Sequence, residues 1–401
     1  MRRFFAAAIV VCSAGALAGI AYGVCALLGL AAFRRRTTPQ ASHSPGISIL
    51  KPLHGGEPRL YENLASFCRQ NYPDFEIIFG TASSEDPALQ TVSELQQHFA
   101  NVRIRIVCGT AESEEGNPKV RNLERLMRAA EHDLLVTADS DIEVGPEYLG
   151  AIAAVFDTPD VGAATCLYGG VPAGGTCAQL GAMHVNDYFA PSVIVATMLS
   201  PLEYCFGATV AFRREALERV GGFRALAAEL ADDYALGRSI AQAGYRVALC
   251  PYVVATTIHE DNFLQLWARE VRWARTIRCV RPAGYAGSVV TYALSLATAT
   301  AFLRPSVATG ALTGAAAAIR LALHFQGGRI FAPAVRATPW LIPLRDLLEL
   351  AVWCAGSTGR NVRWRTARYT ITSRGRITAD EGTTSAPSSR AGRRNGQTPL
   401  Q

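Results

Sequence analysis

Charged residues are scarce in this sequence. Asp, Glu, Lys and Arg make up 18% of the 401 residues, whereas hydrophobic residues make up 49%. A soluble globular chain carries about 25% charged residues, so the shortage indicates that part of the chain lies in lipid. Zinc-finger spacings and aromatic-basic ribonucleoprotein motifs are also missing, and we therefore expect no nucleic-acid partner.

Paired cysteines are missing as well. None of the ten cysteines belongs to a Cys-x-x-Cys pair, and most fall in apolar runs, as buried free thiols do. Such scattered cysteines in a chain of this length argue against a disulfide framework. We expect the soluble part of the protein to work in a reducing compartment.

A long apolar run follows the N-terminus. It extends from Phe4 to Phe33, longer than the roughly 20 residues that span a bilayer and longer than the core of a signal peptide. We predict an uncleaved anchor in residues 1–36, with a cleavable signal peptide as the alternative. Three arginines follow the run and two precede it, so the positive-inside rule places residue 34 onward in the cytoplasm.

The last third of the chain is apolar again. Residues 284–303 and 306–325 are candidate spans, whereas residues 338–354 contain Arg345, Asp346 and Glu349. Charges are costly at the middle of a bilayer, which favours an interfacial or re-entrant helix for 338–354.

The basic and polar residues suggest how this region ends. We assign residues 281–376 to membrane helices and an interfacial helix, and 377–401 to a disordered tail because it is rich in Ser, Gly, Thr and Arg. Arginines cluster beside apolar segments at 34–36, 269–281 and 360–376, which predicts contact with an anionic lipid bilayer.

The middle of the chain reads as an α/β domain. After a polar linker at 37–45, short apolar runs alternate with amphipathic stretches. We predict strands at 46–53, 75–80, 102–107 and 133–138, and helices at 58–70, 87–99 and 119–130. This alternation implies a Rossmann-like, mostly parallel sheet in a catalytic domain of residues 46–280. In such sheets ligands bind beyond the carboxyl ends of the strands.

An acidic turn follows the fourth predicted strand. Asp139-Ser140-Asp141 comes directly after Leu-Leu-Val-Thr-Ala. Two carboxylates at this spacing can hold one hard divalent cation, Mg²⁺ or Mn²⁺, which clamps the phosphates of a nucleotide-sugar diphosphate. Asp-x-Asp also occurs in ordinary surface turns, but its position after a buried strand favours the metal site.

A second acidic pair, Asp232-Asp233, precedes the helical run 234–243. Helix capping and the helix dipole would explain acidic residues there. The functional interpretation is that Asp233 or its neighbour acts as the general base on an acceptor hydroxyl.

The third site is Arg269-Glu270-Val271-Arg272-Trp273. In a helix, Arg269, Arg272 and Trp273 share one face and offer guanidinium groups to a departing diphosphate and an indole to a sugar ring. A basic juxtamembrane helix is the alternative, and further arginines support it at 275, 278 and 281.

Three single residues complete the candidates. Lys51 follows a strand and could face the nucleotide, Asp86 follows the second strand and could accept a hydrogen bond from the nucleoside, and Lys119 opens a helix whose N-terminus suits phosphate. The ordinary alternatives are a solvated lysine, a helix N-cap and a helix that starts with proline.

Taken in order, these motifs resemble the ceramide glucosyltransferase family over about residues 45–285. The matching segments are Ser48–Leu53, Asn71–Glu76, Glu85–Ala88, Asn117–Lys119, Asp139–Ser140, Asp232–Tyr234 and Arg269–Trp273. The resemblance implies a GT-A fold, a UDP-sugar donor, a divalent cation and inversion at the anomeric carbon.

The same resemblance assigns roles to individual residues. Asp86 matches the family's first aspartate, Asp139 the second at the metal and diphosphate site, and Asp233 the third, the proposed base. Arg269, Arg272 and Trp273 match its (Gln/Arg)-x-x-Arg-Trp motif.

Two further features concern the acceptor. The run from Arg272 to Tyr285 looks most like the bacterial branch associated with hopanoid biosynthesis, which implies transfer of N-acetylglucosamine to a polyhydroxylated hopanoid. The animal enzymes have a His-bearing acceptor segment, and His184 lies near its position but out of register, which favours an acceptor other than ceramide.

We therefore predict an inverting glycosyltransferase that moves one N-acetylglucosamine or glucose from a UDP-sugar to a lipid hydroxyl, such as that of bacteriohopanetetrol. It would be multi-pass in the bacterial cytoplasmic membrane, with its catalytic domain in the cytoplasm. The alternatives are a glucosyltransferase acting on ceramide or diacylglycerol, a processive polysaccharide synthase, and an inactive membrane sensor of sugar nucleotides. Two or three spans are few for a polymer pore, and three acidic sites argue against a sensor.

Overall fold

The apolar runs between residues 47 and 138 form the strands that their spacing predicts. The computed structural model describes residues 2–37, 41–109, 116–364, 367–372 and 376–379. In it four strands pair in parallel: β1 (Ile47–Pro52), β2 (Phe75–Thr81), β3 (Arg103–Cys108) and β4 (Leu134–Ala138). The helices between them are α2 (Leu60–Cys68), α3 (Ala88–His98) and α4 (Pro118–Ala129). Each predicted boundary lies within two residues of the observed one.

The sheet continues beyond these strands to eight, in the order β3-β2-β1-β4-β7-β6-β8-β5. The added strands are β5 (Ile142–Glu143), β6 (Val161–Pro172), β7 (Thr209–Arg213) and β8 (Arg246–Ile258). Strand β7 is antiparallel to both β4 and β6, β5 is antiparallel to β8, and β6 and β8 are parallel. The predicted mostly parallel α/β sheet is confirmed.

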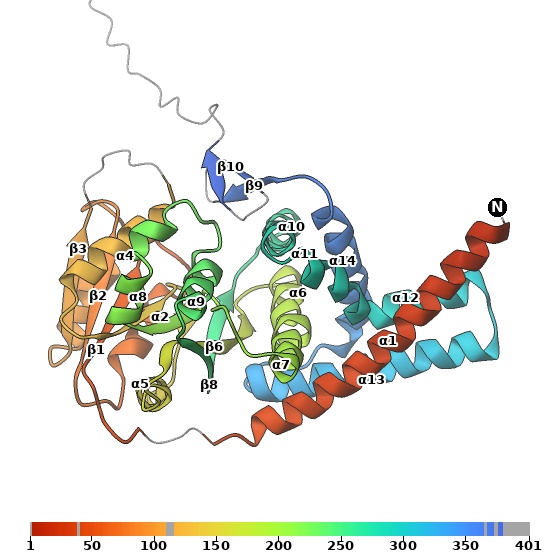
Figure 1. Cartoon of the computed structure of the whole chain (residues 1–401), viewed down its shortest axis with the longest axis horizontal. Helices are drawn as coiled ribbons and strands as arrows, with labels where there is room; N and C mark the ends of the chain where they lie inside the picture. Colours follow the sequence, from red (N-terminus) through yellow and green to blue (C-terminus); the bar gives the residue numbers. More distant parts are fainter. Residues whose placement is uncertain (1, 38–40, 110–115, 365–366, 373–375, 380–401) are drawn as a thin grey trace, which may run out of the picture.

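Helices cover both faces of the sheet (Figure 1). One core packs Ile49 of β1 against α2, α3 and α5 (Tyr148–Val155), and the other packs the next residue, Leu50, against α4, α8 (Arg214–Arg219) and α9 (Asp232–Gln242). A short 3₁₀ turn, η2 (Phe223–Leu226), joins the second core. Because successive side chains of a strand point to opposite faces, the central strands carry apolar residues on both faces.

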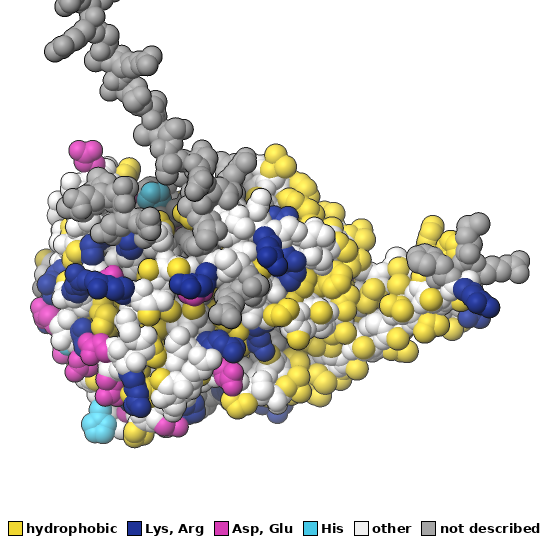
Figure 2. Space-filling model, turned by 45° about the horizontal axis from the view of Figure 1, so that its top comes forward, with side chains coloured by type: hydrophobic (Ala, Val, Ile, Leu, Met, Phe, Trp, Pro, Cys, Tyr) yellow, Lys and Arg dark blue, Asp and Glu magenta, His cyan; other side chains and the backbone are white. Residues whose placement is uncertain are grey.

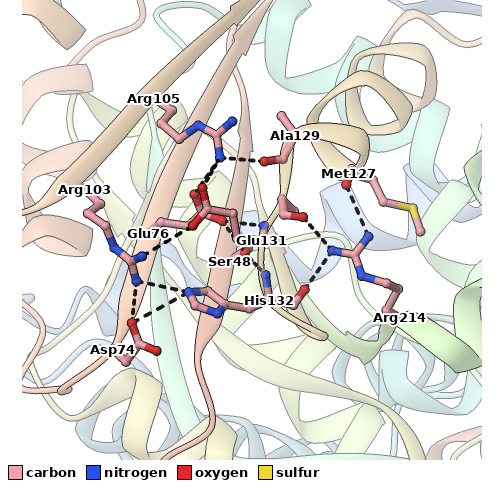
Figure 3. A network of polar contacts seen from close by, with 11 residues as sticks. Ser48, Asp74, Glu76, Arg103, Arg105, Met127, Ala129, Glu131, His132 and Arg214 are labelled. Atoms are coloured by element: carbon pink, nitrogen blue, oxygen red, sulfur yellow. Dashed lines mark hydrogen bonds and ion pairs between the residues drawn. The ribbon is translucent and has the colours of Figure 1, made fainter.

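A polar network ties together the amino ends of the parallel strands (Figure 3). The buried Glu76 carboxylate accepts hydrogen bonds from the Ser48 hydroxyl, the Glu131 backbone N–H and the Arg105 guanidinium. Burial acts to raise the pKa of Glu76, but these hydrogen bonds lower it below the ordinary value. The network lies at the opposite end of the strands from the acidic turn, so its role is structural.

Three long apolar helical segments form a bundle beside the sheet domain (Figures 1 and 2). They are α1 (Arg2–Arg34), the continuous segment of α11 (Pro282–Gly287), η3 (Ser288–Tyr292) and α12 (Ala293–Leu303), and α13 (Val307–Phe331). By length and composition each could cross a membrane. Small residues allow the close approach that membrane helices favour: a side chain at Gly19 would collide with the Val290 carbonyl.

Four further helices, two of them preceded by short helical turns, lie between the sheet and the bundle. They are α6 (Thr176–His184), a π-helical turn η1 (Val185–Phe189) that leads into α7 (Ala190–Leu199), α10 (Phe263–Val280), and α14 (Ile342–Gly356), which the 3₁₀ turn η4 (Pro339–Leu341) precedes. In α14 the charged Arg345, Asp346 and Glu349 are buried, whereas Leu344 and Leu347 are exposed. The charges that argued against a membrane span therefore face the protein.

The C-terminal segment differs from its prediction. Strands β9 (Asn361–Trp364), β10 (Ala367–Ile371) and β11 (Ile377–Ala379) form a small antiparallel sheet. The predicted helical region therefore does not extend to 376, and the predicted tail at 377–401 begins with a strand. Val362 and Ile371 pack on Leu230. These apolar residues could not be recognised as strand residues in the sequence because arginines surround them. Residues 380–401 lie outside the described residues.

Two basic residues of α10 bind the segment that leads into the small sheet. Arg275 donates to the carbonyls of Thr358 and Asn361, and Arg278 donates to the carbonyl of Ser357. These guanidinium groups hold the start of the small sheet.

Candidate active site

The acidic turn lies at the switch point of the sheet. Strand β1 has β2 on one side and β4 on the other, and ligands of open α/β sheets bind beyond the carboxyl ends at such a point. The Asp139 backbone N–H donates to the Ala208 carbonyl, and the Ser140 hydroxyl donates to Glu57 at 2.5 Å. Asp141 accepts a hydrogen bond from the Thr256 hydroxyl at 2.9 Å. The residue before β7 thus holds the backbone of Asp139, and β8 holds the carboxylate of Asp141.

Lys51 lies beneath this turn and does not face a nucleotide. The side chain is fully buried; its Nζ donates to the Asp139 carbonyl at 2.6 Å and lies 3.9 Å from the centre of the Phe67 ring. Burial lowers the pKa of Lys51 to about 7, against the opposing effect of Asp141 and Asp139. The expectation of a nucleotide-facing lysine is corrected: Lys51 supports the backbone that presents the carboxylates.

Lys119 joins the first acidic site to the second. Asn117 caps α4 by accepting a hydrogen bond from the Lys119 backbone N–H at 2.9 Å. The Lys119 Nζ lies 2.7 Å from Asp139 Oδ1 and 3.7 Å from Asp232 Oδ2. The carboxylates of Asp139 and Asp232 hold the pKa of Lys119 above its ordinary value although burial acts to lower it. A charged lysine and a helix N-terminus therefore meet beside the acidic turn, as phosphate binding requires.

Asp233 faces the acidic turn across Gly207. A Cβ atom built on Gly207 would lie 3.2 Å from Asp233 Oδ2 and 3.8 Å from Asp139 Oδ2, so both carboxylates approach the same small space. Neither residue caps α9, whose N-cap is Ala231, but both lie in its first turn, where the helix dipole favours acidic side chains. Burial, and then the charge of Asp233, raise the pKa of the Tyr168 hydroxyl in β6.

The acidic residues carry more negative charge than the nearby lysines offset. Burial and then Asp139 raise the pKa of Asp141 to about 6, and burial and then Asp232 raise the pKa of Asp233 to about 6. A bound cation would relieve this repulsion. The described residues contain no group of three His, Cys, Asp or Glu that could hold a metal. The oxygen donors of Asp139 and Asp141 fit a hard cation only if ligand oxygens complete its coordination.

The Arg-x-x-Arg-Trp residues form a second wall. Arg269 is ion-paired with Glu260, and its guanidinium lies 4.9 Å from the centre of the Trp273 ring. The Arg272 guanidinium has no hydrogen-bond or ion-pair partner among the described residues, and burial, then Arg269, lower its pKa to about 10. Arg272 therefore stays protonated at neutral pH and is free to bind an anion.

Asp86 binds the start of helix α3, close to the helix N-cap role that was the ordinary alternative for this residue. Its Oδ1 accepts hydrogen bonds from the Ala88 and Gly55 backbone N–H groups, both at 2.9 Å. One carboxylate oxygen thus binds the first backbone N–H of α3, whose N-cap is Pro87, and holds the loop after β1. Among the described residues, its Oδ2 has only the His54 ring as a charged or polar neighbour, at 3.9 Å, so that oxygen is still able to accept from a nucleoside.

Sequence reasoning missed four residues of this site: Glu57, Tyr168, Gly207 and Glu260. Each is linked to a residue distant in the chain. Glu57 accepts from Ser140, and Glu260 pairs with Arg269. Gly207 lies beside Asp233, and burial and then Asp233 raise the pKa of Tyr168. Only Glu260 carried a signal, because it closely follows the largely apolar run 247–258.

Comparisons with known proteins agree with this geometry. The sequence profile of the family described as Glycosyl transferase family 21 matches residues 11–377. Ceramide glucosyltransferase 3 of Caenorhabditis elegans is 28% identical over 240 residues, which are 58% of this chain and 51% of that protein. Ceramide glucosyltransferase of Komagataella phaffii is 32% identical over 114 residues, 28% of this chain and 22% of that protein. The chain thus spans about half the length, or less, of the curated relatives it matches.

The fold also has a counterpart among solved structures. The mannosyltransferase PcManGT of Pyrobaculum calidifontis, in complex with GDP-Man and Mn²⁺, superposes with a TM-score of 0.53 at 20% identity, covering 86% of this chain and 97% of that one. At this identity the likeness establishes the fold alone, and it supports the predicted GT-A architecture.

Proposed function

The chain belongs to glycosyl transferase family 21, and we propose that it moves one sugar from a UDP-sugar to the hydroxyl of a membrane lipid with inversion at the anomeric carbon. One observation carries this proposal: Asp139 and Asp233 converge on the space beside Gly207, and Lys119 pairs with Asp139. Arg272, partly buried and unpaired among the described residues, offers a further anion site.

Each side chain has a role in this proposal. Asp139 and Asp141 would hold Mg²⁺ or Mn²⁺ together with the donor's diphosphate, and the cation would neutralise the charge of the phosphates. Lys119 and Arg272 bind the diphosphate oxygens, whose negative charge grows as the bond to the sugar breaks. A solved protein of the same fold binds a nucleotide sugar together with Mn²⁺, which supports a divalent cation here.

Asp233 is the proposed base. It accepts the proton of the acceptor hydroxyl while the hydroxyl oxygen bonds to the anomeric carbon and the bond from that carbon to the diphosphate oxygen breaks. A carboxylate whose pKa is raised to about 6 is a stronger base than an ordinary aspartate and is still ionised at neutral pH. Asp86, through its free Oδ2, accepts from the nucleoside.

The bundle supports a lipid acceptor. We propose that α1, α11–α12 and α13 span the bacterial cytoplasmic membrane, as a three-span anchor of a cytoplasmic domain that comprises residues 46–280. The N-terminus and the turn between α12 and α13 lie at the same far end of the bundle (Figure 1), which agrees with this orientation. Helix α14 lies at the interface with Leu344 and Leu347 toward lipid.

The finer identity of the substrates is part of the proposal. The resemblance of residues 272–285 to the hopanoid-associated branch favours N-acetylglucosamine and a polyhydroxylated hopanoid such as bacteriohopanetetrol. Ceramide is the second candidate acceptor, because the relatives named above are ceramide glucosyltransferases.

The test uses the full chain in lipid nanodiscs. UDP-glucose and UDP-N-acetylglucosamine are each offered with bacteriohopanetetrol, ceramide or diacylglycerol, while UDP release and lipid mass are measured. We expect one sugar per lipid. Asp233→Asn should keep donor binding and lose transfer, whereas Asp133→Asn, at a side chain that is 95% exposed, should keep both. Transfer retained in Asp233→Asn would falsify the base assignment, and a ladder of products would indicate a polymer synthase.

A further inference from the structure

The second residue of the Arg-Glu-Val-Arg-Trp motif is held by a buried arginine from the C-terminal region. Glu270 is 1% exposed and Arg345 of α14 is fully buried. The two form a bidentate pair, with Nη1 to Oε1 at 2.9 Å and Nη2 to Oε2 at 2.7 Å. Such paired hydrogen bonds fix orientation as well as distance. Glu270 therefore sets the rotation of α10 about its axis, and with it the direction of the flanking Arg269.

The contacts of Arg345 continue until they return to the motif. Its Nη2 lies 3.0 Å from Glu349 Oε1, and the same oxygen lies 2.6 Å from His184 Nδ1 on α6. The His184 ring lies against Trp273, with centroids 5.6 Å apart and planes at 33°. A closed ring of contacts thus leaves α10 at Glu270, crosses α14 and α6, and reaches α10 again at Trp273.

The ring is also attached to the helix bundle. Asp346, the next residue of α14, accepts from Arg320 Nε of α13 at 3.0 Å, and the Tyr188 hydroxyl of the π-helical turn donates to the same carboxylate. Arg320 also donates to the Asp187 carbonyl at 3.2 Å. Buried polar contacts therefore connect α10, which carries the motif, through α14 to the candidate membrane span α13.

Stability alone does not account for such an arrangement. Buried ion pairs contribute little net stability compared with apolar side chains of the same volume, because both partners lose water. Burial acts to lower the pKa of Arg345, but Glu349 and Glu270 raise it above its ordinary value, so the guanidinium stays charged and its geometry is kept. What the pair provides is a fixed orientation of α10.

We propose that Arg345 and Glu270 are positioning residues that hold Arg269 and Trp273 in the orientation required for sugar transfer. The proposal rests on the proposed function for the meaning of that orientation. Glu270 stands at a position where the motif allows any residue, and the proposal gives that position a role. Arg345, from the C-terminal region, then helps to orient the side chains of the catalytic domain.

The first test separates kcat from KM. Arg345→Lys keeps the charge but loses the fork of two donors, and Glu270→Gln keeps the shape but loses the charge. Since a displacement of about 1 Å can cost about 100-fold in rate, we expect kcat per folded molecule to fall about 10- to 100-fold in both variants, with a KM for the UDP-sugar that changes far less. Arg320→Lys makes the same chemical change in the neighbouring buried pair and should lose stability without this fall in kcat.

A double variant distinguishes positioning from simple structural support. Glu270→Gln with Arg345→Met removes both buried charges of the pair. We expect the unfolding temperature to recover relative to Arg345→Met alone while kcat stays low. Recovery of kcat together with stability would show that the pair only holds the helices together.

A measurement without turnover keeps the test independent of the proposed function. The chain has five tryptophans, and labelling with 5-fluorotryptophan gives a ¹⁹F resonance for Trp273 that Trp273→Phe identifies. This resonance should shift or broaden in Glu270→Gln and Arg345→Lys but not in Arg320→Lys. An unchanged resonance in both overturns the positioning proposal. Absence of transfer by the wild-type chain would refute the proposed function. The ¹⁹F result would still decide whether Glu270 and Arg345 position Trp273.

Discussion

A methyl group at position 207 would stand between the two carboxylates of the proposed catalytic site. A Cβ atom there would lie 3.2 Å from Asp233 Oδ2 and 3.8 Å from Asp139 Oδ2. The backbone of Gly207 is not in the left-handed region, so Ala can adopt its conformation. The contact with Asp233 is tight, and that carboxylate must move by a few tenths of an ångström. The substitution therefore fills the site without opposing the fold.

The two expected effects differ widely in size. A compatible Gly→Ala change stabilises a protein by about 0.4–1 kcal/mol through the unfolded chain, which offsets the small displacement of Asp233. The methyl also removes water from Asp233, whose pKa burial already raises to about 6. Each further pKa unit corresponds to about 1.4 kcal/mol and tenfold less ionised base at acid pH. With the loss of room for the substrate, we expect kcat/KM to fall about 100-fold.

The assay is UDP release as a function of pH, with the unfolding temperature measured in parallel. The acid limb of kcat/KM should move to higher pH in Gly207→Ala, because the base must be ionised to accept a proton. Gly150→Ala in α5, where a Cβ meets open space, is the matched control and should keep full activity. A folded Gly207→Ala enzyme with wild-type kcat/KM would show that the reaction does not take place between Asp139 and Asp233.

Three other changes test the charges of the site. Lys119→Gln removes a cation that lowers the pKa of Asp233, so the acid limb of the pH–rate profile should move upward; an unmoved limb would contradict the role of Asp233 or its contact with Lys119. In Arg272→Lys, the burial that lowers the pKa of Arg272 to about 10 would also lower the pKa of the lysine below its ordinary value; kcat should then decline toward alkaline pH while the wild type stays level. Removal of divalent ions with EDTA should abolish UDP release, and Mg²⁺ or Mn²⁺ should restore it; full activity in EDTA would exclude the proposed cation.

The parallel half of the sheet could be predicted because its signals are local. Each of β1 to β4 is a short, largely apolar run followed by polar residues. Asp139 comes directly after β4. The rule that ligands bind at the carboxyl ends then locates the acidic turn without any knowledge of packing.

The remaining features depend on which distant segments meet. Lys51 reads as a polar residue at a strand end, and only the packing of Phe67 and the Asp139 carbonyl around it makes it a buried support. Glu270 occupies a variable motif position, and its partner Arg345 lies 75 residues away. The small C-terminal sheet escaped prediction because its two apolar anchors are separated by basic residues.

The bundle of α1, α11–α12 and α13 has a kinetic consequence under the proposed function. The donor would reach the acidic turn by diffusion through the cytoplasm, in three dimensions, whereas the lipid acceptor would arrive only by lateral diffusion within one leaflet. The acceptor's effective concentration is then its mole fraction in the membrane, and rates should fall when inert phospholipid is added at constant amounts of enzyme, acceptor and donor. Saturation curves for the acceptor should therefore superpose when they are plotted against surface density.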